Sequence, residues 1–235
     1  METYKDFLER ISYQQPELLI GEGDFKPDKR VYEKIDPDNS FKPFFGDTVV
    51  FDLDNSTKEM ISKRIKKLYD TVPECFSEQI NTDTIHMTLH DLSASDKLEK
   101  VSAEVFKNEV ELLRLVKVKP QQPKTIKMKS NYIINMVNTS LVLALAPENE
   151  TEWIKLQALY DLVNEVKVCP YPFLTPHITL AYFNYNGFDQ KCADKLRALV
   201  FELNKKSLSV TLDTNKLCYQ KFTSMNDYIS VFGII

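Results

Sequence analysis

The sequence predicts an α+β protein built from two related lobes. Helix and strand patterns alternate along its 235 residues, and one order of elements occurs twice: strand, helix, strand, helix, strand. In both copies the second strand contains His-x-Thr-Leu, at His86–Leu89 and, 91 residues later, at His177–Leu180. Little residue identity links the copies outside this tetrapeptide, so the prediction of two lobes depends on the repeated element order.

The N-terminal residues 1–47 form a predicted leader that wraps the body of the protein. A short helix over Met1–Ser12 is followed by three of the five glycines of the chain and several prolines, which break any longer element. An extension without a role is the alternative. Residues 48–235 are expected to form a single bilobal domain, with lobe-forming repeats of about 48–137 and 138–235.

The first repeat contains alternating and helical patterns of ordinary length. A possible capping box at Ser56 and Glu59 marks the start of its first helix. Its elements are a strand at Val49–Leu53, a helix to about Asp70, the first His-x-Thr strand at Thr84–Leu92, a helix at Asp96–Val116 and a strand at Thr125–Met136.

The second repeat follows the same order, and Pro176 stiffens the approach to its His-x-Thr strand. Its elements are a strand at Ser140–Ala146, a helix at Thr151–Val166, the strand beginning at His177, a helix at Asp189–Asn204 and strands at Ser207–Leu212 and Tyr228–Ile234.

The composition is that of an ordinary globular protein, with 43% apolar and 27% charged residues. A net charge of −4 gives no general attraction for a polyanion, so long duplex nucleic acid is not an expected partner. No apolar stretch follows the charged N-terminus, and none elsewhere approaches the roughly 20 residues of a membrane helix. We therefore expect a cytoplasmic protein without a membrane partner, and we expect it to be a monomer.

The four cysteines are scattered along the chain and form no Cys-x-x-Cys pair. In a chain without an export signal, this spacing predicts reduced thiols rather than a disulfide framework or a zinc knuckle. The residues concerned are Cys75, Cys169, Cys192 and Cys218.

The repeated tetrapeptide carries the functional signal. Two of only three histidines lie in it, and side chains two positions apart on a strand share a face. His86 is therefore expected to point the same way as Thr88, and His177 the same way as Thr179. Two facing imidazoles can divide an acid–base reaction, and the threonine hydroxyls can bind the non-bridging oxygens of a phosphodiester. The pattern fits metal-free phosphoryl transfer.

The two motifs, His86-Met87-Thr88-Leu89 and Pro176-His177-Ile178-Thr179-Leu180, resemble those of the two-histidine (2H) phosphoesterase superfamily, which includes the LigT-like phosphodiesterases. The stretch from Phe41 to Val50 also resembles the segment before the first strand in a less characterised branch. The resemblance covers about residues 40–235. It implies a bilobal fold of mainly antiparallel sheets flanked by helices, with the motifs facing each other across a central groove.

The resemblance also implies roles for the motif residues. His86 and His177 would be the general acid and base, in an order that the sequence leaves open, and Thr88 and Thr179 would hold the phosphate. The implied reaction is cofactor-free hydrolysis of a 2′,3′-cyclic or 2′,5′-linked phosphodiester in a small nucleotide or RNA end. Many LigT-like proteins have an arginine where this chain has Ala181-Tyr182-Phe183, a departure that weighs against RNA or tRNA substrates more than against the chemistry.

Four further residues are candidates for substrate contacts. Regular alternation puts His90 on the face of His86 and puts Phe183 on the face of His177, where its ring could stack on a base. Lys129 and Asn131 share the polar face of their strand and could bind a phosphate or base. Each also has a structural interpretation: a histidine at the groove rim, a core phenylalanine and a solvated strand face.

Two other functions are compatible with the sequence. A zinc site has the right number of histidines, but these lack a shared local spacing and the threonines would have no role. A non-catalytic nucleotide- or RNA-binding module could retain the groove without turning over its ligand. Recovery of an intact bound ligand would distinguish that module from an enzyme.

Overall fold

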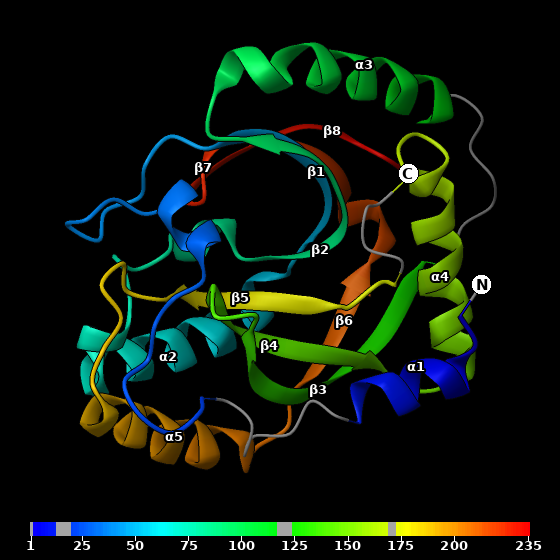
Figure 1. Ribbon diagram of the computed structural model, residues 1–235. Coiled ribbons are helices and arrows are strands. Elements are labelled where there is room, and N and C mark those ends of the chain that lie inside the picture. The colour runs from blue at the N-terminus through cyan, green and yellow to red at the C-terminus, as the bar shows by residue number, and fades with distance from the viewer. Residues whose placement is uncertain (1, 13–19, 117–123, 169–172) are drawn as a thin grey trace.

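The computed structural model describes residues 2–12, 20–116, 124–168 and 173–235, which form two antiparallel sheets of four strands each (Figure 1). The first sheet has the strand order β2 (His86–Ser95), β1 (Phe45–Asp52), β7 (Leu217–Ser224) and β8 (Asp227–Gly233). The second has the order β5 (His177–Tyr182), β4 (Ser140–Pro147), β3 (Thr125–Met136) and β6 (Ser209–Asp213). The predicted α+β class is confirmed.

Helices cover the outer sides of both sheets. α3 (Leu98–Val116) lies along the first sheet, whereas α2 (Asn55–Thr71) and α5 (Gln190–Asn204) lie together on the opposite side of the molecule (Figure 1). α4 (Glu150–Asn164) contacts strands of both sheets, and α1 (Tyr4–Ile11) packs on α4. The arrangement is two-lobed, with each sheet flanked by helices.

The start of α2 differs from the predicted capping box. Asp54 is the N-cap residue, and its side chain accepts hydrogen bonds from the backbone N–H and the hydroxyl of Thr57. Ser56 instead donates its hydroxyl to the Asp54 carboxylate. An aspartate two residues earlier therefore takes the capping role, because a carboxylate accepts several such bonds at once.

The two sheets do not coincide with the predicted halves of the sequence. β3, placed by the sequence in the first repeat, pairs with β4 in the second sheet, because a tight turn at Val137 and Asn138, both with positive φ, joins the two strands as a hairpin. The division near residue 137 is thus corrected. The last two strands belong to the first sheet, where β7 pairs with β1 and β8 pairs with β7.

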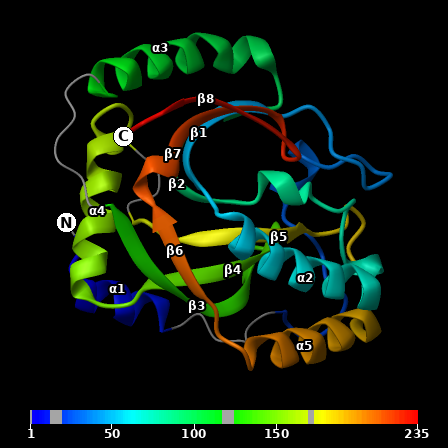
Figure 2. The same cartoon turned by 180° about the vertical axis from the view of Figure 1, so that it is seen from behind.

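β7 was not predicted. It is a central strand, but Gln220 and Lys221 interrupt its apolar pattern. Figure 2 shows β6 and β7 following one another along the back of the molecule, so that this segment connects the second sheet to the first. The first sheet therefore combines strands from both ends of the chain, whereas the second is formed by the strands between them.

Residues 20–44 pack against the body. Phe25 forms an isolated bridge with Phe188 and stacks on its ring at 4.6 Å between centroids. Val31 and Ile35 are fully buried, and Phe44 is 6% exposed just before β1. This part of the predicted leader therefore supplies side chains to the main hydrophobic core.

Three of the four cysteines lie in the described residues, and all three are free thiols: Cys75, Cys192 and Cys218. Cys169 lies outside the described residues. Within the described ranges, no helix combines the length and the apolar character needed to cross a bilayer.

The close approach of β1 to its neighbours gives a stability prediction. A Cβ atom at Gly46 would collide with the carbonyl oxygen of Ser93 and with the ring of Phe222. Gly46→Ala should therefore lower the free energy of unfolding by about 3 kcal/mol, the upper end for overpacking, as measured by urea denaturation.

Gly21→Ala is the matched control, because Gly21 has no atom within 4 Å of the added methyl group and has no positive φ. It should change the free energy of unfolding by less than about 1 kcal/mol. Equal effects of the two substitutions would contradict the proposed collision.

Candidate active site between the two sheets

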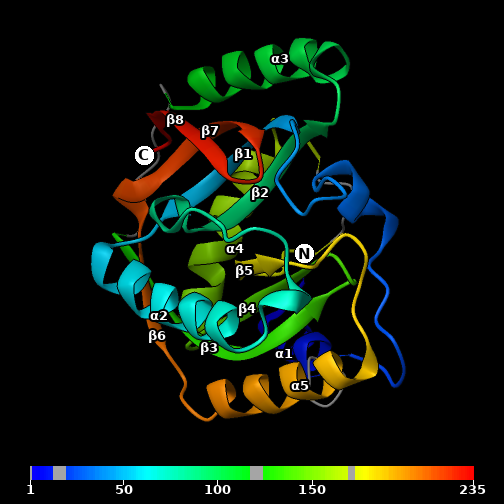
Figure 3. The same ribbon diagram turned by 90° about the vertical axis from the view of Figure 1, so that its left-hand side faces the viewer.

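The two His-x-Thr strands lie next to each other at the centre of the molecule. β2 is the edge strand of the first sheet, β5 is the edge strand of the second, and the two are in contact (Figures 1 and 3). His86 and Thr88 are partly exposed, whereas Met87 between them is fully buried. His177 and Thr179 show the same pattern around a buried Ile178. Each polar pair therefore lies on one face of its strand, opposite the buried residue between its members.

The two imidazoles are anchored in the same way. Nδ1 of His86 lies 2.7 Å from the carbonyl oxygen of Thr84, and Nδ1 of His177 lies 2.7 Å from the carbonyl oxygen of Thr175. A carbonyl oxygen can only accept, so Nδ1 must carry a proton in each ring. The neutral form of each histidine then presents an Nε2 lone pair, and the charged form presents an Nε2–H donor.

The surroundings of His86 favour its neutral form. Burial lowers the pKa of His86, and positive charge on His177 lowers it further, while the hydrogen bond to Thr84 acts in the opposite direction. The ring of Tyr228 meets His86 edge-on, with centroids 4.8 Å apart. The effect of charge on His177 means that the two imidazoles lie within electrostatic range of each other.

The threonine hydroxyls are available for a ligand. Among the described residues, no hydrogen bond involves Oγ1 of Thr88 or Oγ1 of Thr179. A hydroxyl on the same strand face as an imidazole can donate to an oxygen that the imidazole also approaches. Each strand thus offers one acid–base group and one neutral donor.

His90 does not face the site. Val50 pairs with Thr88 and Val49 pairs with His90, so Leu89 is an extra residue in β2 and forms a β-bulge. The bulge reverses the alternation and turns His90 to the other face. There it is 1% exposed, its ring lies 5.1 Å from that of Tyr160, and Nε2 is 3.2 Å from Oδ1 of Asn164.

Asp91 occupies the position that regular alternation assigned to His90. It pairs with Thr48, which lies two residues from Val50 on the site face of β1. Asp91 therefore shares the strand face of His86 and Thr88, and its carboxylate raises the pKa of His86, against the larger lowering by burial. The sequence interpretation missed Asp91, because a single-residue bulge leaves no local pattern in the sequence.

β5 has a bulge at the equivalent place. Val142 pairs with Thr179 and Leu141 pairs with Ala181, so Leu180 is the extra residue. Tyr182, rather than Phe183, therefore shares the face of His177. Phe183 is fully buried among the rings of the core, 4.6 Å from Phe25 between centroids, and the prediction that it stacks on a substrate base is wrong.

Lys129 and Asn131 are not brought to the motif residues. Lys129 pairs with Ala146, and α1 covers Ala146 through Phe7 and Ile11. Together Lys129 and Asn131 line a separate pocket of about 700 Å³ between α1, β3 and α5. None of the four motif residues lines this pocket, so the predicted contact with the same substrate is not supported by their position.

The three histidines cannot share one metal ion in this arrangement, because His90 faces away from His86. Within the described ranges, no group of three or more His, Cys, Asp or Glu side chains could hold a metal. The zinc interpretation of the sequence therefore finds no set of ligands among these residues.

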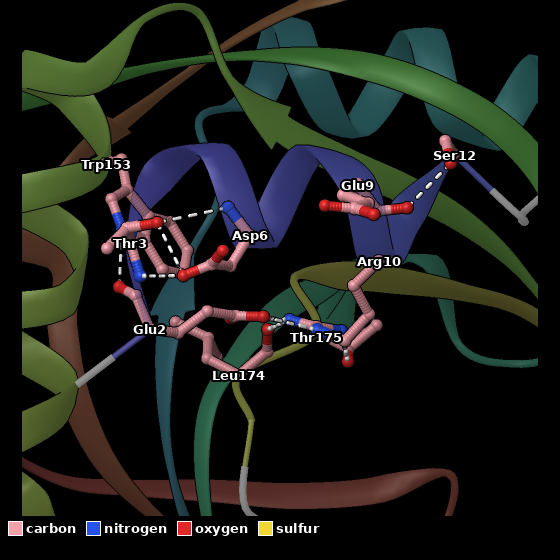
Figure 4. Close-up of polar contacts among 9 residues, drawn as sticks. All are labelled: Glu2, Thr3, Asp6, Glu9, Arg10, Ser12, Trp153, Leu174 and Thr175. Atoms are coloured by element: carbon pink, nitrogen blue, oxygen red, sulfur yellow. Dashed lines mark hydrogen bonds and ion pairs between the residues drawn. The ribbon is translucent and has the colours of Figure 1, made fainter.

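The N-terminal helix is tied to the residues that anchor His177 (Figure 4). Arg10 donates to the hydroxyl of Thr175 at 3.0 Å and to the carbonyl oxygen of Leu174 at 2.8 Å. The same guanidinium forms an ion pair with Glu2, N–O 2.7 Å. α1 thus holds the segment whose next carbonyl, that of Thr175, accepts the bond from His177.

Comparisons with known proteins show a shared fold. No protein-family model matches the sequence, and no curated protein matches it either. The chain is similar in structure to a conserved protein of unknown function, ATU0111 from Agrobacterium tumefaciens, with a TM-score of 0.70, 14% identity and coverage of 90% of this chain and 94% of that one. This likeness establishes the fold and leaves the activity open.

E. coli LigT, a member of the family that the paired motif resembles, is also among the similar structures. Its apo form has a TM-score of 0.48 and 16% identity, with coverage of 80% of this chain and 95% of that one. Its complex with 3′-AMP has a TM-score of 0.48 and 17% identity, with coverage of 81% of this chain and 97% of that one.

The coupling of the two histidines can be tested by NMR titration. In the native protein, His86 should titrate below the ordinary histidine pKa of about 6.5. Because charge on His177 contributes to this shift, His177→Gln should raise the pKa of His86, while burial should still keep it below about 6.5. An unchanged pKa of His86 in His177→Gln would show that the two rings do not interact.

The docking of α1 can be tested through the single tryptophan. Phe7 stacks on Trp153 at 4.4 Å, and the indole N–H donates to the carbonyl oxygen of Glu2. Arg10→Ala leaves Glu2 without its partner and should cost about 1–3 kcal/mol of docking free energy. Trp153 emission should then shift to longer wavelength and acrylamide quenching should increase, whereas Lys5→Ala, at an exposed position of α1, should change neither.

Proposed function

We propose that this protein is a metal-independent phosphodiesterase of the two-histidine class, which hydrolyses a 2′,3′-cyclic or 2′,5′-linked phosphodiester of a small nucleotide or RNA end. One observation carries the proposal. His86 and His177 come from edge strands of different sheets, and each is held by an Nδ1–carbonyl bond of 2.7 Å that leaves Nε2 for a substrate. The paired motifs with their threonines support it further.

The reaction needs one proton acceptor and one proton donor. A neutral imidazole accepts a proton from water at Nε2 as the water oxygen bonds to phosphorus, and the bond from phosphorus to the leaving sugar oxygen breaks. The other imidazole, protonated, donates its Nε2 proton to that leaving oxygen. One water molecule is consumed, and the product is a phosphomonoester with a free hydroxyl.

The lowered pKa of His86 favours the base role for this residue in hydrolysis. Burial and the positive charge of its partner both disfavour a proton on His86, so its imidazole is the better suited of the two to accept a proton. The products leave the two roles exchanged, and transfer of a proton through solvent restores the starting state.

The threonines supply neutral donors to the phosphate. Thr88 and Thr179 lie on the same strand faces as the two histidines, so their hydroxyls can reach the non-bridging oxygens. Negative charge accumulates on these oxygens as the bonds rearrange, and a hydrogen bond that strengthens at that stage lowers the barrier.

Histidine substitutions test the proposal directly. His86→Ala and His177→Ala should each lower kcat by about 10²–10⁴-fold, the usual contribution of a general acid or base. Hydrolysis of 2′,3′-cyclic nucleotides and 2′,5′-linked dinucleotides, with product analysis, is the measurement. Unchanged turnover in either variant would refute the assignment, and loss of native activity in EDTA would refute the metal-independent reaction.

The hydroxyl of Thr88 can be tested with an isosteric pair. Thr88→Val removes the donor and should lower kcat/KM by about tenfold to a hundredfold, whereas Thr88→Ser keeps the hydroxyl and should retain most of the activity. Equal activities of the two variants would exclude a donor role for this side chain.

The pH dependence of kcat/KM should follow the protonation state of His86. The base must be neutral, so kcat/KM should fall as pH decreases through the lowered pKa of His86, and this acid limb should lie below about pH 6.5. A nucleotide that binds in the groove and is recovered intact at every pH would instead support the non-catalytic binding module.

A further inference from the structure

A half-buried ammonium group lies beside the candidate site. Lys34 directly follows the short 3-10 helix Lys29–Glu33, in the segment that precedes β1. Its Nζ is 5.2 Å from the ring centroid of Phe44 and 5.7 Å from that of Tyr182. Among the described residues, this ammonium has neither a hydrogen bond nor an ion pair.

Tyr182 connects Lys34 to the His-x-Thr strand of the second sheet. The bulge at Leu180 turns Tyr182 to the face of His177 and Thr179, as the pairing of Tyr182 with Ser140 shows. The aromatic ring that contacts the ammonium therefore lies on the strand face that carries the second motif. Lys34 therefore contacts β5, the strand that carries the second motif, at a residue that follows His177 and Thr179.

Asp91 connects Lys34 to the first sheet. Burial lowers the pKa of Lys34, and the carboxylate of Asp91 counteracts this. The same carboxylate acts on His86 and on the hydroxyls of Tyr182 and Tyr228, after the larger effect of burial in each case. Asp91 thus lies within electrostatic range of both Lys34 and His86.

An ammonium in this position favours an anionic partner. Removal of a charge from water is costly, and two aromatic faces offset only about 0.5–2 kcal/mol of that cost. Asp91 is solvent-exposed and forms no ion pair with Lys34 among the described side chains. A dianionic phosphate that enters between the rings can supply charge-assisted hydrogen bonds to all three ammonium protons.

We propose that Lys34, with Phe44 and Tyr182, forms a second anion subsite that binds a terminal phosphate of the substrate, at a distance from the phosphodiester that is hydrolysed. The inference rests on the proposed function and narrows its substrate class to nucleotides with a phosphomonoester in addition to the phosphodiester. Such substrates are 5′-phosphorylated 2′,3′-cyclic nucleotides and 5′-phosphorylated 2′,5′-dinucleotides.

The carboxylate of Asp91 is suited to bind the nucleoside that links the two phosphates of such a substrate. A carboxylate repels a phosphate but accepts hydrogen bonds from sugar hydroxyls or from the amino group of a base. Because Asp91 acts on both His86 and Lys34, a substrate that reaches from the histidines to Lys34 would place its nucleoside, rather than a phosphate, near this carboxylate.

Calorimetric binding separates this subsite from catalysis. The two probes are adenosine 3′-monophosphate and adenosine 3′,5′-bisphosphate, which differ by one phosphate. The native protein should prefer the bisphosphate by about tenfold or more, a difference of about 1.4 kcal/mol. Lys34→Gln should remove most of this preference and leave the affinity for the monophosphate within about twofold of the native value. Lys34→Arg keeps the positive charge and should retain the preference for the bisphosphate.

Lys29→Gln is the matched control, since it removes the same charge from an exposed position five residues earlier. It should leave the preference unchanged, which distinguishes a local contact from a general effect of net charge. The subsite would be refuted if Lys34→Gln still preferred the bisphosphate to the monophosphate. It would also be refuted if the native protein showed no such preference.

The binding test of the subsite and the hydrolysis test of the proposed function can fail separately. If the native protein prefers the bisphosphate through Lys34 but hydrolyses no phosphodiester, the subsite stands and the proposed function fails. If it hydrolyses cyclic nucleotides without regard to a 5′-phosphate, the function stands and the subsite is refuted.

Discussion

The arrangement of the site depends on one irregularity that occurs twice: an extra leucine directly after each His-x-Thr. Leu89 and Leu180 interrupt the pairing of β2 and β5, and each bulge reverses the alternation beyond it. Without the bulges, Asp91 would point toward the core and His90 into the groove. A buried carboxylate without a partner would cost several kcal/mol, so the bulges reconcile a polar groove with an apolar interior.

The positions of the two strands keep the energetic cost of these bulges small. β2 and β5 are edge strands, so each is paired on one side only, and an unpaired residue disturbs one ladder rather than two. The free edges also let the two strands approach each other between the sheets. The same placement therefore permits the bulges and brings the motifs together.

The two histidines have equivalent hydrogen bonds but different supports. The carbonyl that holds His86 belongs to Thr84, at the end of the 3-10 turn Thr82–Thr84, where Lys58 also donates to the carbonyl oxygen of Asp83. The carbonyl that holds His177 belongs to Thr175, which Arg10 binds from α1. A near-symmetric pair of imidazoles thus arises from unrelated local structures, and the N-terminal helix contributes to one of them.

Local patterns in the sequence determined the elements and the main pairing of residues. Helical periodicity and strand alternation act over a few residues, so the five described α-helices and most strands follow from the sequence. The common face of His86 with Thr88, and of His177 with Thr179, follows from the same alternation. The resemblance of the paired motifs to a known superfamily likewise needed only their residues and spacing.

Only the tertiary structure decided which strands meet and where alternation fails. The return of β7 to β1 is a pairing between distant segments, and the hairpin of β3 with β4 crosses the boundary between the predicted repeats. No local period encodes either pairing. The bulges at Leu89 and Leu180 are visible only against a partner strand. They move His90 and Phe183 into the interior and place Asp91 and Tyr182 on the strand faces of His86 and His177, because one inserted residue reverses the face of the residues that directly follow it.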